Sequence, residues 1–220
     1  MPPLHVIDPT RLGLEIAFSL IIILLCLLIY FRTNEMYNLT KHKGISYFRN
    51  TFLFFSLAYL FRVFFLMVIL VTMSSGNQLM RIIHPPALIL TGLFSSLAII
   101  SLTLSLIWKN VKDNYLGYAM YFIALIISVS AIVSDNSPLT LLILELLLFI
   151  FTTIISFINL RKTNKKPNLL VIYNLLFMFW LISIFSMTIL KVHFAINTLL
   201  LGISAILFLI IFFKVKKWTK

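Results

Sequence analysis

The sequence contains little charge and very little acid. Only 11% of its 220 residues are charged, and Asp and Glu together number 6. A soluble domain of this length would carry about twice that charged fraction to cover its surface. Hydrophobic residues make up 61% of the chain, and the mean hydropathy is +1.09. The composition therefore excludes a soluble globular fold and predicts an integral membrane protein with one membrane domain over residues 1–220.

Several familiar chemical motifs are also absent. The single cysteine, Cys26, cannot form an intramolecular disulfide. No GxSxG, HExxH or Walker loop occurs, so the usual membrane hydrolases and ATP-driven pumps lack their parts. The last apolar segment contains no lysine that could bind retinal. These absences favour a protein that is not an enzyme and has no organic cofactor.

The apolar residues form seven runs, each close to the roughly 20 residues that a helix needs to cross a bilayer. We therefore predict an all-α seven-helix membrane bundle, with breaks at polar stretches such as "RTNEMYNLTKHKGIS" and "SSGNQLMRIIH", which comes before the Pro85-Pro86 pair. Only Lys191 and His193 separate the last two runs. The predicted spans cover residues 12–31, 47–73, 85–108, 115–133, 139–160, 168–190 and 194–213.

Basic residues lie mainly on one side of these predicted spans. On the other side stand only Arg11, Arg81 and Lys191. Because Lys and Arg accumulate in cytoplasmic loops, we expect the N-terminus outside and the C-terminus in the cytoplasm of a cell-membrane protein. This topology also accounts for the net charge of +12 without a nucleic-acid partner. The basic residues are Arg32, Lys41, Lys43, Arg49, Lys109, Lys112, Arg161, Lys162, Lys165, Lys166, Lys214, Lys216, Lys217 and Lys220.

Charged residues deep inside the spans are the strongest functional signal. Arg62 lies in the middle of the second span, and Glu145 lies at a similar depth in the fifth. A lone arginine at this depth costs about 2.5 to 3.5 kcal/mol on insertion scales, so it requires a partner or access to water. We expect Arg62 to face Glu145, with Glu15 of the first span as the competing partner.

Other polar residues could complete a ligand-binding pocket around this pair. Tyr59 is one helical turn from Arg62, and Thr152, Ser156 and Asn159 continue the face of Glu145, which should point inward. Asn174 and Asn197 in the last two spans either line the pocket or bond neighbouring helices. The alternative is that all these groups only lock the packing of the helices.

A metal site has little support in the sequence. Three of the four histidines, His5, His84 and His193, fall on the predicted outer side, but no two of them have metal-ligand spacing. We therefore expect no metal cofactor.

Two functional classes remain, and the polar groups discriminate between them in part. The first is a sensor or receptor-like module whose outward-facing pocket, formed by Arg62, Glu145, Tyr59 and Glu15, binds a small molecule. Its basic cytoplasmic loops would contact anionic lipids or a protein partner. The alternative is a small-solute or ion transporter with two three-helix repeats around a linker helix, or a non-catalytic scaffold subunit. Because the deep charges lie in the outer half, the sequence favours sensing.

Overall fold

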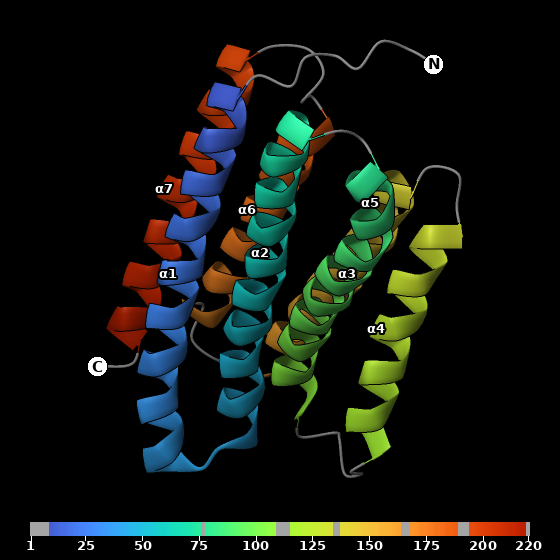
Figure 1. The fold of residues 1–220 in the computed structure, drawn as a ribbon. Coiled ribbons are helices and arrows are strands. Elements are labelled where there is room, and N and C mark those ends of the chain that lie inside the picture. Colours follow the sequence, from blue (N-terminus) through green and yellow to red (C-terminus); the bar gives the residue numbers. More distant parts are fainter. Residues whose placement is uncertain are drawn as a thin grey trace.

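A computed structural model describes residues 9–75, 78–108, 115–133, 137–163, 168–188 and 194–218. Within these ranges the chain is all-helical, with seven helices and no strands. They are α1 (Pro9–Thr40), α2 (Lys43–Ser75), α3 (Gln78–Ile107), α4 (Tyr115–Val133), α5 (Ser137–Thr163), α6 (Asn168–Thr188) and α7 (Phe194–Trp218). The predicted seven-helix bundle is confirmed (Figure 1).

The helices follow from the apolar sequence, because a backbone inside lipid must satisfy its own polar groups, and a helix does so within one segment. Among the described residues, five helices are long and apolar enough to cross a membrane: α1, α2, α3, α5 and α7. The apolar stretches of α4 and α6 are shorter, at Tyr118–Ser130 and Val171–Ser183.

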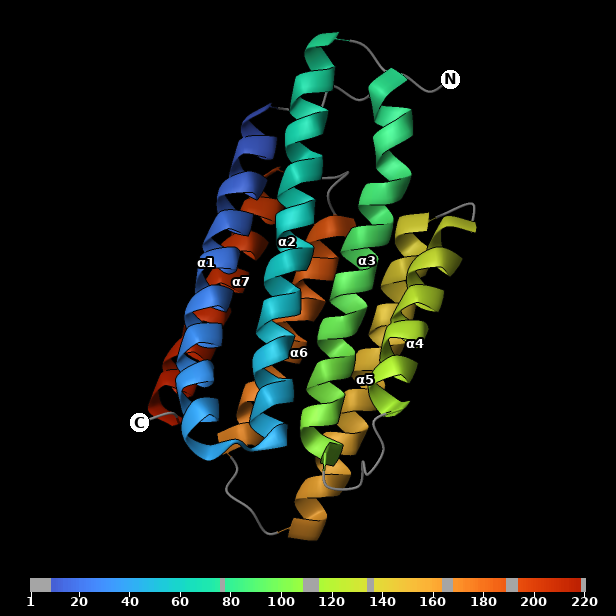
Figure 2. The same cartoon turned by 60° about the horizontal axis from the view of Figure 1, so that its bottom comes forward.

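Six of the helices form a closed ring, and α4 lies outside it. Neighbours in the ring are α1 and α2, α2 and α3, α3 and α5, α5 and α6, α6 and α7, and α7 and α1. Helix α4 packs only against α3 and α5, at the edge of the bundle in both views (Figures 1 and 2). In the sequence, three helices of the ring precede this peripheral helix and three follow it.

The core of the ring consists largely of aromatic side chains. Phe48, Phe52, Phe149, Phe179 and Phe208 are all at most 2% exposed and belong to one cluster. These rings come from α2, α5, α6 and α7. They fill the bundle axis between helices that are not neighbours in the ring.

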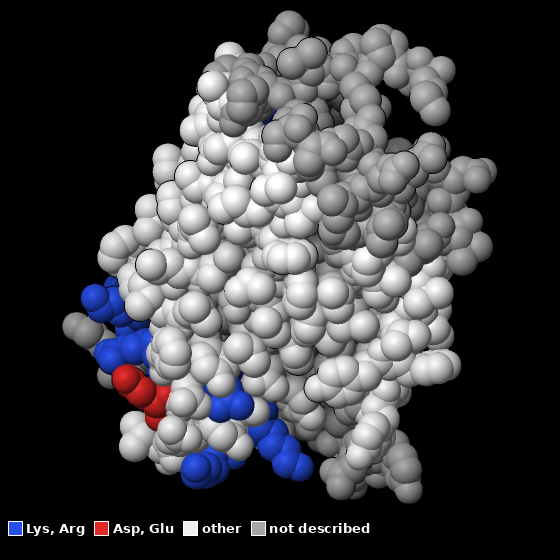
Figure 3. All heavy atoms as spheres, in the orientation of Figure 1, with Lys and Arg blue, Asp and Glu red and all other residues white. Residues whose placement is uncertain are grey.

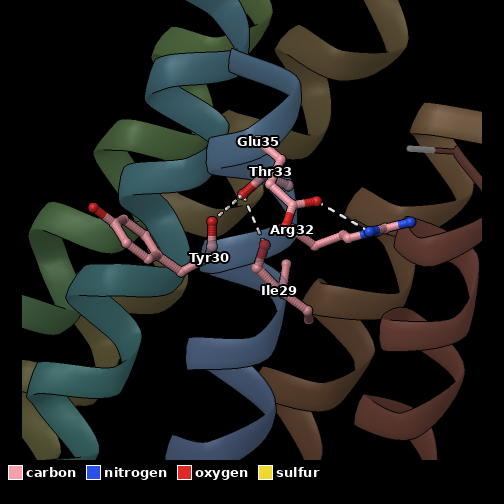
Figure 4. Close-up of polar contacts among 5 residues, drawn as sticks. All are labelled: Ile29, Tyr30, Arg32, Thr33 and Glu35. Atoms are coloured by element: carbon pink, nitrogen blue, oxygen red, sulfur yellow. Dashed lines mark hydrogen bonds and ion pairs between the residues drawn. The ribbon is translucent and has the colours of Figure 1, made fainter. Parts of the chain in front are cut away.

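The first predicted break is much shorter than its polar stretch, because α1 continues to Thr40 and α2 begins at Lys43. Figure 4 shows the local contacts: the Thr33 hydroxyl donates to the carbonyl oxygens of Ile29 and Tyr30, and Arg32 pairs with Glu35 at 3.0 Å. Such contacts at helical spacing support a helix that continues through this polar stretch. The chain reverses at Lys41, whose φ of 51° lies in the left-handed region.

In the second predicted break, "SSGNQLMRIIH", α2 ends at Ser75 and α3 begins at Gln78, so both Pro85 and Pro86 lie inside α3. Each proline removes one backbone donor, but membrane helices tolerate this where neighbours can compensate. The other predicted breaks, at residues 109–114, 134–138, 161–167 and 191–193, lie wholly or in part outside the described residues, and separate helices flank each of them.

Basic side chains gather at the end of the bundle where α1 ends and α7 terminates (Figure 3). The contributing described residues are Arg32, Lys41, Lys43, Arg49, Lys214, Lys216 and Lys217. We call this the basic end. At this end Arg49 links α2 to α1. Its Nη1 donates to Asn34 Oδ1 at 2.6 Å, and its guanidinium lies 4.8 Å from the centroid of the Tyr37 ring.

Candidate functional site

A cavity of about 380 Å³ opens between α1, α2, α3, α5 and α6. Four of the six predicted site residues line it: Glu15, Tyr59, Arg62 and Glu145. They come from α1, α2 and α5, so folding brings together residues that are distant in the sequence. The remaining lining residues are Phe55, Ala58, Phe65, Leu66, Ala87, Leu88, Thr91, Ser95, Leu141, Leu142, Phe179, Trp180 and Ser183.

The cavity lies in the half of the bundle away from the basic end. Arg62 is about 19 residues from the start of α2 at the basic end and about 13 from its other end, or ~28 and ~20 Å. Glu15 is about six residues from the start of α1, and Glu145 about eight from the start of α5. All three charges therefore lie nearer to the ends of their helices that are opposite the basic end.

Arg62 pairs with Glu15 and not with Glu145. Its Nη2 lies 3.5 Å from Glu15 Oε2, and both side chains are largely buried. The direct Arg62–Glu145 contact that we favoured is therefore wrong, and the competing partner is the observed one. Among the described helices, α2, which carries Arg62, packs against α1, which carries Glu15, but not against α5, which carries Glu145. Glu15 is therefore on a neighbouring helix of Arg62, and Glu145 is not.

Tyr59 supports the arginine from one turn earlier on α2. The Arg62 guanidinium lies 5.9 Å from the Tyr59 ring centroid, within the range of a cation–π contact. The Tyr59 ring also contacts the Phe179 ring of α6, with 6.4 Å between the centroids. Tyr59 therefore connects the ion pair to the opposite wall of the cavity.

Glu145 has hydrogen-bond donors but no cationic partner. The Ser95 hydroxyl of α3 donates to its Oε1, and Trp180 of α6 makes a second side-chain contact with the carboxylate. Within the described part of the chain, neither ion pair involves Glu145, although its side chain is 7% exposed. The carboxylate is therefore held in place without a compensating charge.

The polar face that follows Glu145 on α5 points inward, as expected. Thr152 and Ser156 are both 2% exposed, and the hydroxyl oxygen of Thr152 lies 2.6 Å from that of Thr103 on α3. The Asn159 side chain lies outside the described residues. These groups lie beyond the cavity and join α5 to α3.

The two predicted asparagines do not line the cavity. Asn174 is exposed on α6, and Asn197 is buried at 2% in α7, a helix that contributes no lining residue. Neither position is therefore near Arg62 or Glu145 in the site. Helical phase alone could not separate these residues from the lining, because α6 and α7 are apolar on all sides.

Sequence reasoning missed four polar lining residues: Thr91, Ser95, Trp180 and Ser183. Thr91 and Ser95 are one turn apart on the face of α3 that contains Ala87, and this spacing was a usable signal. Trp180 and Ser183 lie among aromatic and apolar residues without any polar pattern. They line the cavity because α6 packs against α5.

The described residues contain no group of three or more His, Cys, Asp or Glu side chains that could hold a metal ion. The side chains of His5, His84 and His193 lie outside the described residues. The absence of a metal site therefore stays a prediction for that part of the chain.

A comparison with known proteins gives one informative relative. The chain is 32% identical over 220 residues to an uncharacterized protein of Archaeoglobus fulgidus, and the match covers 94% of this chain and 92% of the relative. No protein-family model and no solved structure matches the chain.

Proposed function

The chain belongs to the same family as the Archaeoglobus fulgidus protein, and we propose that it is a membrane-embedded sensor that binds a small molecule in the cavity. The single observation that carries this proposal is the convergence of Arg62, Glu15 and Glu145 on one cavity. Ionisable groups inside a membrane are costly, and they commonly mark ligand or ion sites.

The size and lining of the cavity suit a small organic ligand. Ligand pockets typically have volumes of about 300–1,000 Å³ and apolar walls with a few oriented polar groups. The volume of about 380 Å³ lies within this range. Its walls are mostly Phe, Leu and Ala, whereas the polar groups converge from α1, α2, α3, α5 and α6. Such a lining could bury the apolar part of a ligand and orient its polar part.

A column of aromatic contacts leads from the cavity to the basic end. Tyr59 and Phe179 line the cavity, and Trp218 lies near the end of α7 beside the terminal lysines. A change in the packing of Tyr59 therefore has a physical path to Trp218, which supports sensing. The rings in order are Tyr59, Phe179, Phe208, Phe52, Phe48 and Trp218, with centroid separations of 6.4, 4.8, 6.4, 5.1 and 5.6 Å.

The basic end would deliver the response. In the orientation predicted from the basic loops, it faces the cytoplasm of the cell membrane, and the cavity faces outward. Lys214, Lys216 and Lys217 would contact anionic headgroups, with Trp218 at the interface. A cytoplasmic protein partner would bind the basic end and respond when the basic end changes position.

The test is a screen of chemically diverse small solutes for thermal stabilisation of the purified protein in detergent. Ala58 lines the cavity and is 5% exposed, so Ala58→Leu should fill part of it and abolish stabilisation. Ala195→Leu, at an exposed position on α7, is the matched control and should leave stabilisation unchanged. Stabilisation that survives Ala58→Leu, or no stabilising solute at all, would contradict the proposal and leave a structural scaffold.

Transport is the second candidate, favoured by a polar seam that continues from the cavity. Beyond the Ser95–Glu145 contact, Thr103 contacts Thr152, and the Ser105 and Tyr173 hydroxyl oxygens lie 2.6 Å apart. The arrangement of three helices on either side of α4 would also suit two repeats. Uptake of a stabilising solute into proteoliposomes would favour transport, whereas binding without uptake favours sensing.

A further inference from the structure

The charges around the cavity do not balance. Arg62 and Glu15 form an ion pair and neutralise each other. Glu145 is the additional carboxylate, and the Ser95 hydroxyl donates a hydrogen bond to it without supplying positive charge. A buried carboxylate in an apolar surrounding needs a proton or a cation to neutralise it. When Glu145 is ionised, the residues that line the cavity therefore carry one more negative than positive charge.

Five aromatic residues line the same cavity as Glu145: Phe55, Tyr59, Phe65, Phe179 and Trp180. Aromatic faces attract cations, and pockets of aromatic rings with a carboxylate are suited to substituted ammonium groups. A proton on Glu145 would neutralise the charge but would make no use of these rings.

We propose that the cavity binds a small organic cation, with its ammonium group at Glu145 against the aromatic rings and its apolar part along Leu88, Leu141 and Leu142. This inference rests on the proposed function, because it names the class of ligand that the same cavity takes. One carboxylate and one hydroxyl supply far fewer than the roughly six to eight oxygen ligands that Ca²⁺ takes, which favours an organic cation over Ca²⁺.

An anionic ligand fits the same charges poorly. Arg62 is the one lining residue with a permanent positive charge, and Glu15 already pairs with it. A carboxylate or phosphate ligand would have to displace Glu15 and would then face two glutamates. Its binding would leave both of them without a counter-charge in a buried site.

The test uses three probes of similar shape and different charge on the unaltered protein. Benzyltrimethylammonium is cationic, neopentylbenzene has the same shape without charge, and 3-phenylpropanoate is anionic. We expect the cation to stabilise the protein and to bind at least tenfold more tightly than its neutral isostere. Equal binding of the cation and the neutral probe, tighter binding of the anion, or no binding of the cation would overturn the inference.

Glu145→Gln then tests the residue that we assign to the cation. It should raise the Kd for benzyltrimethylammonium at least tenfold and leave the Kd for neopentylbenzene unchanged. Glu35→Gln is the matched control, because Glu35 pairs with Arg32 at the basic end, and it should change neither Kd. An unchanged Kd for the cation in Glu145→Gln would overturn the assignment. If this variant does not fold, the comparison of the three probes on the unaltered protein still tests whether the cavity binds a cation.

The failure of this inference differs from the failure of the proposed function. If a neutral or anionic solute stabilises the protein and Ala58→Leu abolishes the effect, the cavity is a binding site but not for a cation. If no solute of any class stabilises the unaltered protein, both proposals are wrong, and a proton neutralises Glu145.

Discussion

Arg62 and Glu15, 47 residues apart in the sequence, form a largely buried ion pair with 3.5 Å between Nη2 and Oε2. The pair joins α2 to α1 at the wall of the cavity and leaves Glu145 to hydrogen-bond donors alone. The positive charge of Arg62 thus serves mainly to neutralise Glu15. The arrangement makes the contributions of the two glutamates separable by mutation.

Arg62→Leu should lower the free energy of unfolding by about 3–5 kcal/mol, because it leaves Glu15 buried and unpaired. Arg62→Leu combined with Glu15→Leu should recover most of this loss, measured as thermal stability in detergent. Arg62→Leu combined with Glu145→Leu should not. A recovery with Glu145→Leu instead would mean that Arg62 is coupled to the other carboxylate.

A matched control for this cycle lies at the basic end. Arg32 and Glu35 are also an Arg–Glu pair, but their side chains are 39% and 68% exposed. Exposed pairs contribute about 0–1 kcal/mol. Arg32→Leu should therefore change the stability far less than Arg62→Leu.

Ser95→Ala should destabilise the protein by about 1.5–3 kcal/mol, because it removes a hydroxyl that donates to the Glu145 carboxylate. The adjacent residue provides the control. Ser96 is 0% exposed, and its hydroxyl has no hydrogen-bond partner within the described structure, so Ser96→Ala should cost almost nothing. Equal losses in the two variants, measured by thermal unfolding, would contradict the role of Ser95.

Gly92→Ala should cost about 1–3 kcal/mol by overpacking the contact between α3 and α5. A Cβ atom at Gly92 would lie 2.5 Å from Leu141 Cδ1, so the leucine side chain would have to move. Adding Leu141→Ala to this variant should recover part of the loss. Because Leu141 also lines the cavity, Gly92→Ala should alter solute binding as well.

Two other helical glycines serve as controls for this prediction. A Cβ atom at Gly13 or Gly202 would meet no atom within 4 Å. Alanine is a better helix former than glycine by about 1 kcal/mol. Gly13→Ala and Gly202→Ala should therefore be neutral or slightly stabilising, and a loss as large as that of Gly92→Ala would contradict the packing explanation.

The orientation in the membrane can be tested by cysteine labelling of intact cells with an impermeant maleimide. Native Cys26 is buried at 0% exposure and can be replaced by alanine to give a cysteine-free background. Thr10→Cys, near the start of α1, should be labelled from outside. Lys217→Cys, at the end of α7, should be labelled only after permeabilisation. The reverse pattern would contradict the predicted topology.

The sequence predicts the helices well and their ends less well. Long apolar runs must be helical in lipid, so all seven helices could be placed from hydropathy alone. Polarity, however, marks where a helix leaves the bilayer and not where it ends. Helix α1 therefore continues past Arg32 to Thr40, and α3 includes the two prolines.

The site is predicted in its charges but not in their pairing. Arg62, Glu15, Glu145 and Tyr59 could be selected because charged and polar groups at this depth are costly. The choice between Glu15 and Glu145 depends on which helices are neighbours, and this is not contained in helix length or phase. For the same reason Trp180 and Ser183 were missed, and Asn174 was expected near a cavity that it does not line.

The most direct test of sensing uses the three tryptophans, whose indole N–H groups can be followed by ¹⁵N NMR of the purified protein. Trp180 lines the cavity, Trp218 lies at the end of the aromatic column, and Trp108 contacts His42 near the connection between α1 and α2. On titration with benzyltrimethylammonium, or with the neutral or anionic solute that stabilises the protein if the cation does not, we expect saturable shifts of the Trp180 and Trp218 signals with the same Kd, and a smaller shift of Trp108. A Trp180 signal that does not move, or one that moves while Trp218 stays unchanged, would contradict a sensor that binds its ligand in the cavity and responds at the basic end.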